Sequence, residues 1–305
     1  MHAGPLTSTR NDVFIFRNWY HTVETGLAAD TGQSERLGTE RAEELIERLA
    51  GPDFRSARML EMTRNPLLLT NLCLVHRDRG GLPRGRHQLY DECIEVLLER
   101  WRENKALPVH VSAATGRRVL QPVALWLHEK KGRTRASVDE LAPIMEPALE
   151  AAKWGGGDAA ALLRTVRDEN GLLTGWGPDQ YGFMHLGFQE YLAACELRRK
   201  AFEDHKDTVL GELASHYGQS WWQEVILLLL AQGNPSLFAP FVQKALRQMP
   251  FKDAEDLLEL VLEEAVDVSA RPFLELLEEA PGRDAKQWAR QGIALRVLEG
   301  LVNNE

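Results

Sequence analysis

His185 occupies the position in this chain that is best suited to contacting an anionic ligand. It follows Phe183-Met184, and the run after it, Leu186-Gly187-Phe188-Gln189-Glu190-Tyr191-Leu192-Ala193-Ala194, has apolar residues at helical spacing. A histidine at a helix start lies beside backbone N–H groups that have no helical carbonyl to bond, a position suited to an anion. A capping role alone would also explain a histidine there.

Pro66 lies at a second predicted helix start. Asn65 precedes it, and residues 67–75 supply an apolar body. Asparagine is a preferred N-cap and proline is favoured in the first turn, so the pair predicts a helix beginning at Pro66. This preference explains the proline without any ligand.

The sequence lacks the motifs of phosphate and hydrolytic chemistry. It contains no G-x-x-x-x-G-K-[ST] loop, and no apolar strand ends in an acidic pair that would hold magnesium. Neither H-E-x-x-H nor G-x-S-x-G occurs. We therefore expect no catalytic residue and no metal site, and we expect that this chain alone does not hydrolyse a nucleotide.

Composition favours a folded protein of two or three subdomains. The chain has 305 residues, of which 44% are hydrophobic, and its formal net charge of -9 is spread along it, which argues against a nucleic-acid partner. Cys73, Cys93 and Cys195 have no C-x-x-C partner, and we interpret them as reduced core residues. The longest apolar run, residues 225–231, is too short to span a bilayer. No signal peptide is evident, so we expect a cytoplasmic protein without a membrane partner.

Helical periodicity covers most of the chain after residue 39. Helices are predicted over residues 41–49, 66–75, 88–101, 113–129, 138–152, 158–167 and 186–199. Residues 171–184 predict a β-hairpin, because glycine and proline separate two short apolar runs. Three helices followed by a hairpin is the order of a winged helix, with the hairpin as its wing. Beyond residue 205, breaks at glycine and proline separate short helices, as in a helical solenoid.

Three segments resemble the NACHT family of STAND signalling NTPases, to which NOD-like receptors are related. The run from Phe183 to Ala194 resembles the consensus in which a phenylalanine and a histidine precede a Phe-Gln-Glu-Tyr/Phe-Leu-Ala-Ala helix in the winged-helix domain. Asn65-Pro66-Leu67 resembles a stretch of the first helical domain, and the run from Leu89-Tyr90 to Trp101 resembles the first winged-helix helix. The three segments occur in the family's order.

The resemblance implies that His185 contacts the β-phosphate of ADP and that Pro66 packs against its adenine ring. A NACHT protein carries its phosphate loop and magnesium-binding residues upstream of these segments, so the chain would begin after the nucleotide-binding core. Residues 13–20 would correspond to the chain leaving the nucleotide-binding sheet. ADP or ATP would then bind only together with the missing nucleotide-binding domain, and the parent protein would be an ATPase.

We therefore expect a mainly α protein with a small helical domain, a winged-helix domain with a short β-hairpin, and a helical-repeat-like tail. Residues 1–38 would be a remnant or linker, 39–82 the helical domain, 83–200 the winged helix, and 201–305 a HEAT/ARM-like tail or second helical domain. The expected function is regulatory: coupling ADP/ATP state and ligand sensing to oligomerisation and signalling, in innate immunity or antiviral defence. Two alternatives stay open, a helical scaffold for protein partners and a winged-helix regulator that binds DNA.

Overall fold

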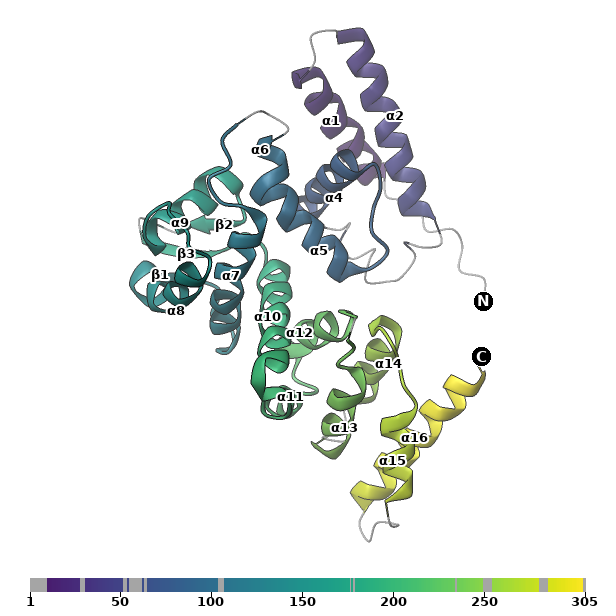
Figure 1. Ribbon diagram of the computed structural model, residues 1–305. Helices are drawn as coiled ribbons and strands as arrows, with labels where there is room; N and C mark the ends of the chain where they lie inside the picture. Colours follow the sequence, from purple (N-terminus) through teal and green to yellow (C-terminus); the bar gives the residue numbers. More distant parts are fainter. Residues whose placement is uncertain are drawn as a thin grey trace. The chain divides into compact units, whose positions relative to one another are not determined.

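The protein is mainly helical, and its described residues include one small antiparallel sheet (Figure 1). The computed structural model describes residues 10–27, 31–51, 54, 62, 65–103, 107–175, 177, 179–233, 235–248, 254–279 and 285–303. The chain divides into two compact units, residues 1–113 and 114–305, and each unit has its own buried core. The predicted fold class is confirmed.

Helices build the described part of the first unit. They are α1 (Arg10–Leu27), α2 (Thr31–Ala50), α4 (Pro66–Arg79), α5 (Arg86–Glu95), the π-helical turn η2 (Val96–Arg100) and α6 (Trp101–Glu103). Helix α1 packs along α2, and Gly38 on α2 permits their close approach, because a Cβ there would lie 3.2 Å from the carbonyl oxygen of Tyr20. Phe16 and Tyr20, one helical turn apart on α1, are fully buried.

Buried polar contacts tie α1 to α2 and α4. The carboxylate of Glu24 on α1 accepts hydrogen bonds from Arg41 Nη1 at 2.7 Å and from Arg77 Nε at 2.8 Å. Tyr20 Oη lies 2.7 Å from His76 Nδ1 and donates to the carbonyl oxygen of Cys73. Residues 1–38, expected to be a remnant or linker, thus contribute packed helix wherever the structure describes them.

The second unit begins with three helices and a hairpin in the order of a winged helix. Its elements are α7 (Ala113–His128), β1 (Ala136–Ser137), α8 (Val138–Ala151), α9 (Ala159–Thr165), the π-helical turn η3 (Val166–Asn170), β2 (Leu173–Gly175), β3 (Gln180–Phe183) and α10 (Leu186–Lys200). Capping side chains set where two of these helices begin: Ser137 forms a capping box with Glu140 on α8, and Asp158 accepts from Ala161 N on α9.

The sheet has the strand order β1-β3-β2, and all pairs are antiparallel. Strands β2 and β3 form the predicted hairpin, with Leu173 opposite Phe183 and Thr174 opposite Gly182. The sequence did not reveal β1, because a two-residue strand is too short to show the alternation by which strands are predicted.

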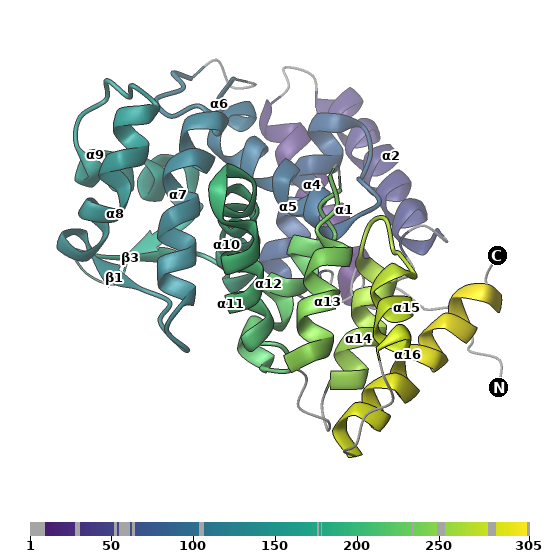
Figure 2. The same ribbon diagram turned by 60° about the horizontal axis from the view of Figure 1, so that its bottom comes forward.

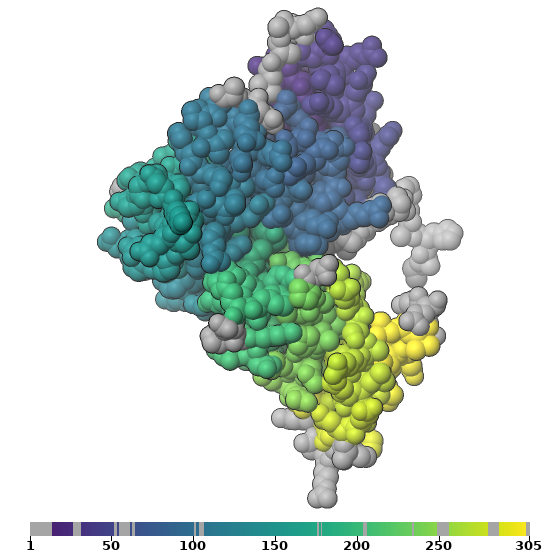
Figure 3. All heavy atoms as spheres, in the orientation of Figure 1, coloured from purple at the N-terminus to yellow at the C-terminus, as the bar shows by residue number. Residues whose placement is uncertain are grey.

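A stack of helices in two layers follows α10 and the π-helical turn η4 (Ala201–His205). Its members are α11 (Lys206–Ser215), α12 (Ser220–Leu230), α13 (Phe238–Gln248), α14 (Ala254–Glu264), α15 (Arg271–Glu278) and α16 (Ala285–Asn303). Helices α10, α12 and α14 pack in one row, and α11, α13 and α15 pack in another, as Figure 2 shows. Their side chains fill much of the space between neighbouring helices (Figure 3). Packing of each helix on the helix two positions along the chain is typical of helical repeats.

No helix in the described part of the chain is both long and apolar enough to cross a membrane.

A ring cluster joins the winged helix to this stack. Fully buried His128, at the end of α7, stacks on Trp221 with ring centroids 4.6 Å apart, and the ring of Trp222 lies nearly perpendicular to it with centroids 4.8 Å apart. His128 Nε2 lies 2.8 Å from the carbonyl oxygen of Trp221, so this nitrogen carries the proton and donates. Trp221 Nε1 donates back to the carbonyl oxygen of His128 at 2.7 Å. Burial lowers the pKa of His128 from 6.5 to about 4.

Acidification should therefore weaken the second unit through His128. The unfolded chain takes up a proton below the ordinary pKa of 6.5, whereas the folded protein resists protonation until the pKa of about 4. Stability is thus fully present above this window and falls through it, by up to roughly 3 kcal/mol. We expect His128→Gln to flatten the dependence of unfolding free energy on pH, measured by denaturant titration between about pH 7 and pH 4. Equal slopes for variant and wild type would contradict this assignment.

Candidate functional site

His185 lies between the hairpin and the helix that follows it. Strand β3 ends at Phe183, and Met184 N donates to the carbonyl oxygen of Leu172 at 3.1 Å, which extends the hairpin to the residue before His185. His185 itself is extended (φ -142°, ψ 139°), and α10 begins at the next residue. The predicted junction of wing and helix is therefore present.

The imidazole of His185 caps helix α10. Its Nδ1 accepts a hydrogen bond from the backbone N–H of Gly187 at 3.0 Å. An accepting Nδ1 carries no proton, so the neutral ring has its proton on Nε2. Burial lowers the pKa of His185, which favours this neutral form at physiological pH.

The second ring nitrogen of His185 is available for a ligand. Within the described part of the chain, Nε2 has no hydrogen-bonding partner, and the residue is only half-buried. An Nε2–H donor beside the amino end of a 15-residue helix would meet an anion with both a hydrogen bond and the positive end of the helix dipole. The cap and an anion contact are therefore compatible, because they use opposite nitrogens of one ring.

Pro66 is the first residue of α4, as predicted. Asn65 caps this helix, with Oδ1 accepting from Leu67 N at 2.9 Å and from Leu68 N at 3.4 Å. The Pro66 ring is exposed, whereas Leu68 and Leu69 behind it are buried. An exposed ring is open to stacking by a ligand, and the helix start also accounts for it without one.

The two predicted site residues belong to different units, Pro66 to residues 1–113 and His185 to residues 114–305. The surroundings of each residue are therefore described within its own unit. A joint role for the two residues in nucleotide binding stays a prediction.

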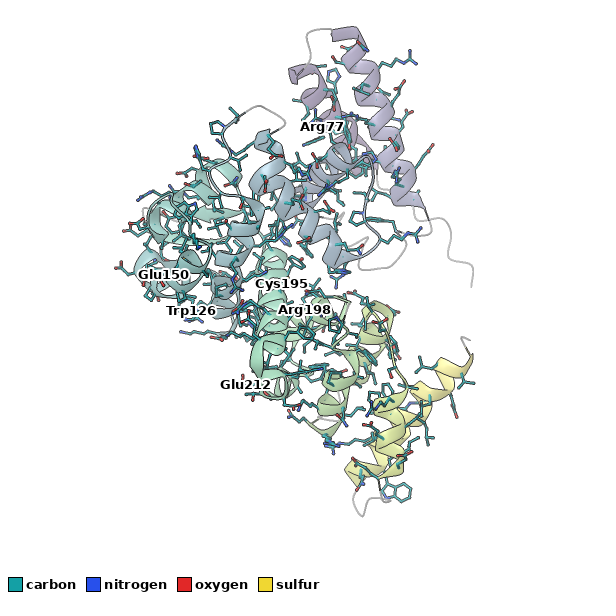
Figure 4. All side chains as sticks on the ribbon, in the orientation of Figure 1. Arg77, Trp126, Glu150, Cys195, Arg198 and Glu212 are labelled. Atoms are coloured by element: carbon teal, nitrogen blue, oxygen red, sulfur yellow. The ribbon has the colours of Figure 1, made fainter. Side chains whose placement is uncertain are left out.

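Arg198 was not singled out by the sequence, although it ties the helix of His185 to the helical stack. It projects from α10 (Figure 4) and donates to the carbonyl oxygens of Gln232, Gly233 and Pro235 at 3.0, 2.8 and 2.9 Å. These carbonyls lie in the loop after α12, which ends at Leu230. Sequence patterns gave no signal for this contact, since the partners lie 34 to 37 residues away.

The helix ahead of the wing has little free positive charge for DNA. Arg167 donates two hydrogen bonds to the carboxylate of Asp168, at 2.6 and 2.9 Å, and its guanidinium lies 5.2 Å from the ring of Tyr181. Arg164 is exposed, and Glu169 follows on the same segment. Phosphate contacts dominate DNA affinity, so this balance of charge does not favour a DNA-binding role.

Among the described residues, no group of three or more histidine, cysteine, aspartate or glutamate side chains is arranged to hold a metal ion. Cys73 and Cys93 are buried, Cys195 is half-buried, and none of the three forms a disulfide with another described residue.

The helix order and the strand order β1-β3-β2 define a winged helix-turn-helix domain. Residues 86–197 match the family described as the winged helix-turn-helix domain C-terminal to NACHT. The resemblance drawn from the sequence is thus confirmed for residues 86–197, a segment that contains His185 and has the features of the winged helix that follows NACHT. Comparison with curated proteins gave no match.

Two substitutions test whether His185 stabilises the fold by capping α10 through Nδ1. His185→Ala removes the acceptor for Gly187 N–H and should lower the unfolding free energy by about 1 kcal/mol, or Tm by about 2–4 °C. His185→Asn supplies another capping oxygen and should retain most of that stability. Thermal unfolding of the two variants beside wild type makes the comparison. Equal losses in both variants would show that the ring stabilises the fold by packing and not by capping.

Proposed function

We propose that this chain is the regulatory half of a NACHT NTPase, in which His185 senses the bound nucleotide. The match of residues 86–197 to the winged helix that follows NACHT carries this proposal. The site geometry supports it, because the Nδ1 cap leaves Nε2–H as a donor at a helix start. In the proposed resting state this donor bonds the β-phosphate of ADP held by the NTPase domain, and Pro66 packs against the adenine.

The nucleotide acts here as a latch between two arrangements. One hydrogen bond to a charged phosphate is worth about 1.5–3 kcal/mol, enough to bias two packings that differ by only a few kcal/mol. Exchange of ADP for ATP would weaken the contact with His185 and release the winged helix. The parent protein would then oligomerise and signal, in innate immunity or antiviral defence.

Hydrolysis belongs to the NTPase domain in this proposal. The sequence has no phosphate loop and no magnesium-binding acidic pair, so ADP and ATP would bind only when that domain is supplied by the parent protein or by another chain. The regulatory half works in the cytoplasm, where nucleotide exchange occurs. It contributes a sensor and no catalytic group.

The helical stack is the proposed ligand sensor. The ring pair His128–Trp221 joins it to α7, and the guanidinium of Arg198 joins it to α10, the helix that His185 caps. A force applied to the stack by a bound ligand would reach α10 through these contacts. This coupling supports a path from ligand sensing to the nucleotide contact.

ADP retention by this chain combined with its NTPase domain tests the proposal. His185→Asn keeps the helix cap and removes the imidazole donor, so it should weaken ADP binding by about 10–100-fold, the loss of one charge-assisted hydrogen bond. Ser137→Ala is the matched control, since it removes the cap of α8 at similar cost in stability and should leave ADP affinity unchanged. Calorimetric titration measures both. Unchanged ADP affinity in His185→Asn would refute the sensor role.

Pro66 has a separate test in the same assembly. Pro66→Ala should keep the start of α4, because Asn65 remains as its cap. Loss of ring stacking should lower the affinity for ADP by about tenfold or less. Inorganic pyrophosphate has no adenine, so its affinity should equal that of wild type. An equal loss for both ligands would place the effect away from the adenine.

A further inference from the structure

An apolar groove of about 500 Å³ lies between α14 and α16, at the last helices of the stack. Leu258 and Ile293, which line it, are buried, whereas Leu262, Val297 and Leu301 are only half-buried. Its volume falls within the range of ligand-binding clefts, about 300–1,000 Å³. The groove therefore leaves apolar surface that a partner could cover.

The groove interrupts the packing pattern of the stack. In the first row α10 packs on α12 and α12 packs on α14, whereas α16 packs on α15. Helix α16 lies at the end of the stack in Figures 1 and 2. From α14, Leu258 and Leu262 line the groove. A groove bounded by two helices and lined with leucines is suited to one more helix.

The two walls of the groove carry opposite charges. Glu259 and Glu263 line it from α14, one helical turn apart, and both are exposed. Within the described residues neither carboxylate takes part in an ion pair. Arg296 lines the facing wall from α16. A ligand that placed cations toward α14 would therefore neutralise two carboxylates that the stack leaves to solvent.

We propose that this groove binds an amphipathic helix of a partner protein, with lysines or arginines directed at Glu259 and Glu263. Apolar anchors at positions i, i+4 and i+7 of that helix would cover the leucines, as in other cases of helix-in-groove recognition. Basic residues four positions apart would match the spacing of the two carboxylates. The inference deepens the sensor role proposed for the stack and rests on it only for its place in signalling.

Two synthetic peptides test the chemistry of the partner. The first is a helix of about 15 residues with a leucine stripe flanked by lysines on one side, and the second has glutamates in place of the lysines. We expect the full chain to bind the lysine peptide with a Kd on the order of 10–100 µM and the glutamate peptide at least about tenfold more weakly. Fluorescence anisotropy measures both, without nucleotide or NTPase domain. No binding of the lysine peptide up to about 1 mM, or equal binding of the two, would overturn the proposal.

Two glycines on α16 provide a matched test of whether the peptide binds in the groove. A Cβ added at Gly300, which lines the groove, or at Gly292, which does not, would meet no atom within 4 Å. Gly300→Leu should therefore fill the groove and weaken the lysine peptide by at least about tenfold, whereas Gly292→Leu should not change its affinity. Both substitutions replace a helical glycine and should keep or raise stability, which thermal unfolding checks. Equal effects of the two on peptide binding would place the peptide elsewhere.

Charge reversal tests whether the basic side chains of the peptide face Glu259 and Glu263 on α14. The double variant Glu259→Lys with Glu263→Lys should reverse the preference, so that the glutamate peptide binds more tightly than the lysine peptide. Glu212→Lys with Glu278→Lys is the control, because both residues are exposed and lie on α11 and α15. It changes the net charge equally and should keep the preference of wild type. A similar shift in both double variants would show a general attraction to an acidic protein and overturn the assignment to the groove.

The outcomes for the groove and for His185 are independent. Peptide binding that survives His185→Asn would support the groove even if ADP affinity did not depend on the imidazole. A second copy of the chain is the competing occupant. Sedimentation equilibrium that showed a dimer lost in Gly300→Leu and kept in Gly292→Leu would assign the groove to self-association and refute the partner helix.

Discussion

One hydrogen bond, from Gly187 N–H to Nδ1 of His185, sets the chemistry of the candidate site. It fixes where α10 begins and also which nitrogen of the ring keeps its proton. Because the bond uses Nδ1, the remaining donor is Nε2–H, beside the positive end of the helix. A serine or aspartate cap would satisfy the helix equally well but would leave no N–H for an anion.

The same helix is mechanically connected to the stack that follows it. Arg198 bonds three carbonyls beyond the end of α12, and His128 with Trp221 joins α12 to α7. The His128 ring is buried, so its Nε2 would be costly to leave unpaired. The winged helix and the first helices of the stack therefore form one continuous structure within their unit, which is the condition for coupling one to the other.

Helix starts and turns could be predicted from the sequence, because residues close together in the chain determine them. The helix starts at Pro66 and Leu186 and the hairpin at residues 173–183 follow from capping, proline and glycine preferences, and all three are confirmed. The burial of Tyr20 against His76 and the contacts of Arg198 depend on residues more than thirty positions away, where periodicity carries no signal. Residues 13–20 were assigned by family analogy although their own pattern is helical, with Phe16 and Tyr20 on one face.

The helix cap also affects the free-energy cost of binding an anion at Nε2 of His185. At many helix starts a ligand must compete with the capping side chain for the same N–H groups, so binding breaks one bond to make another. At His185 the ligand would add to the cap, since Nδ1 stays bonded to Gly187 and only Nε2 changes partner, from solvent to anion. The ring is already oriented by its bond to the helix, and the depressed pKa keeps it neutral. Little conformational entropy is then lost on binding. An anion at such a site would therefore exchange one solvent contact of Nε2 for one ligand contact and leave the helix cap in place, as a reversible nucleotide latch would require.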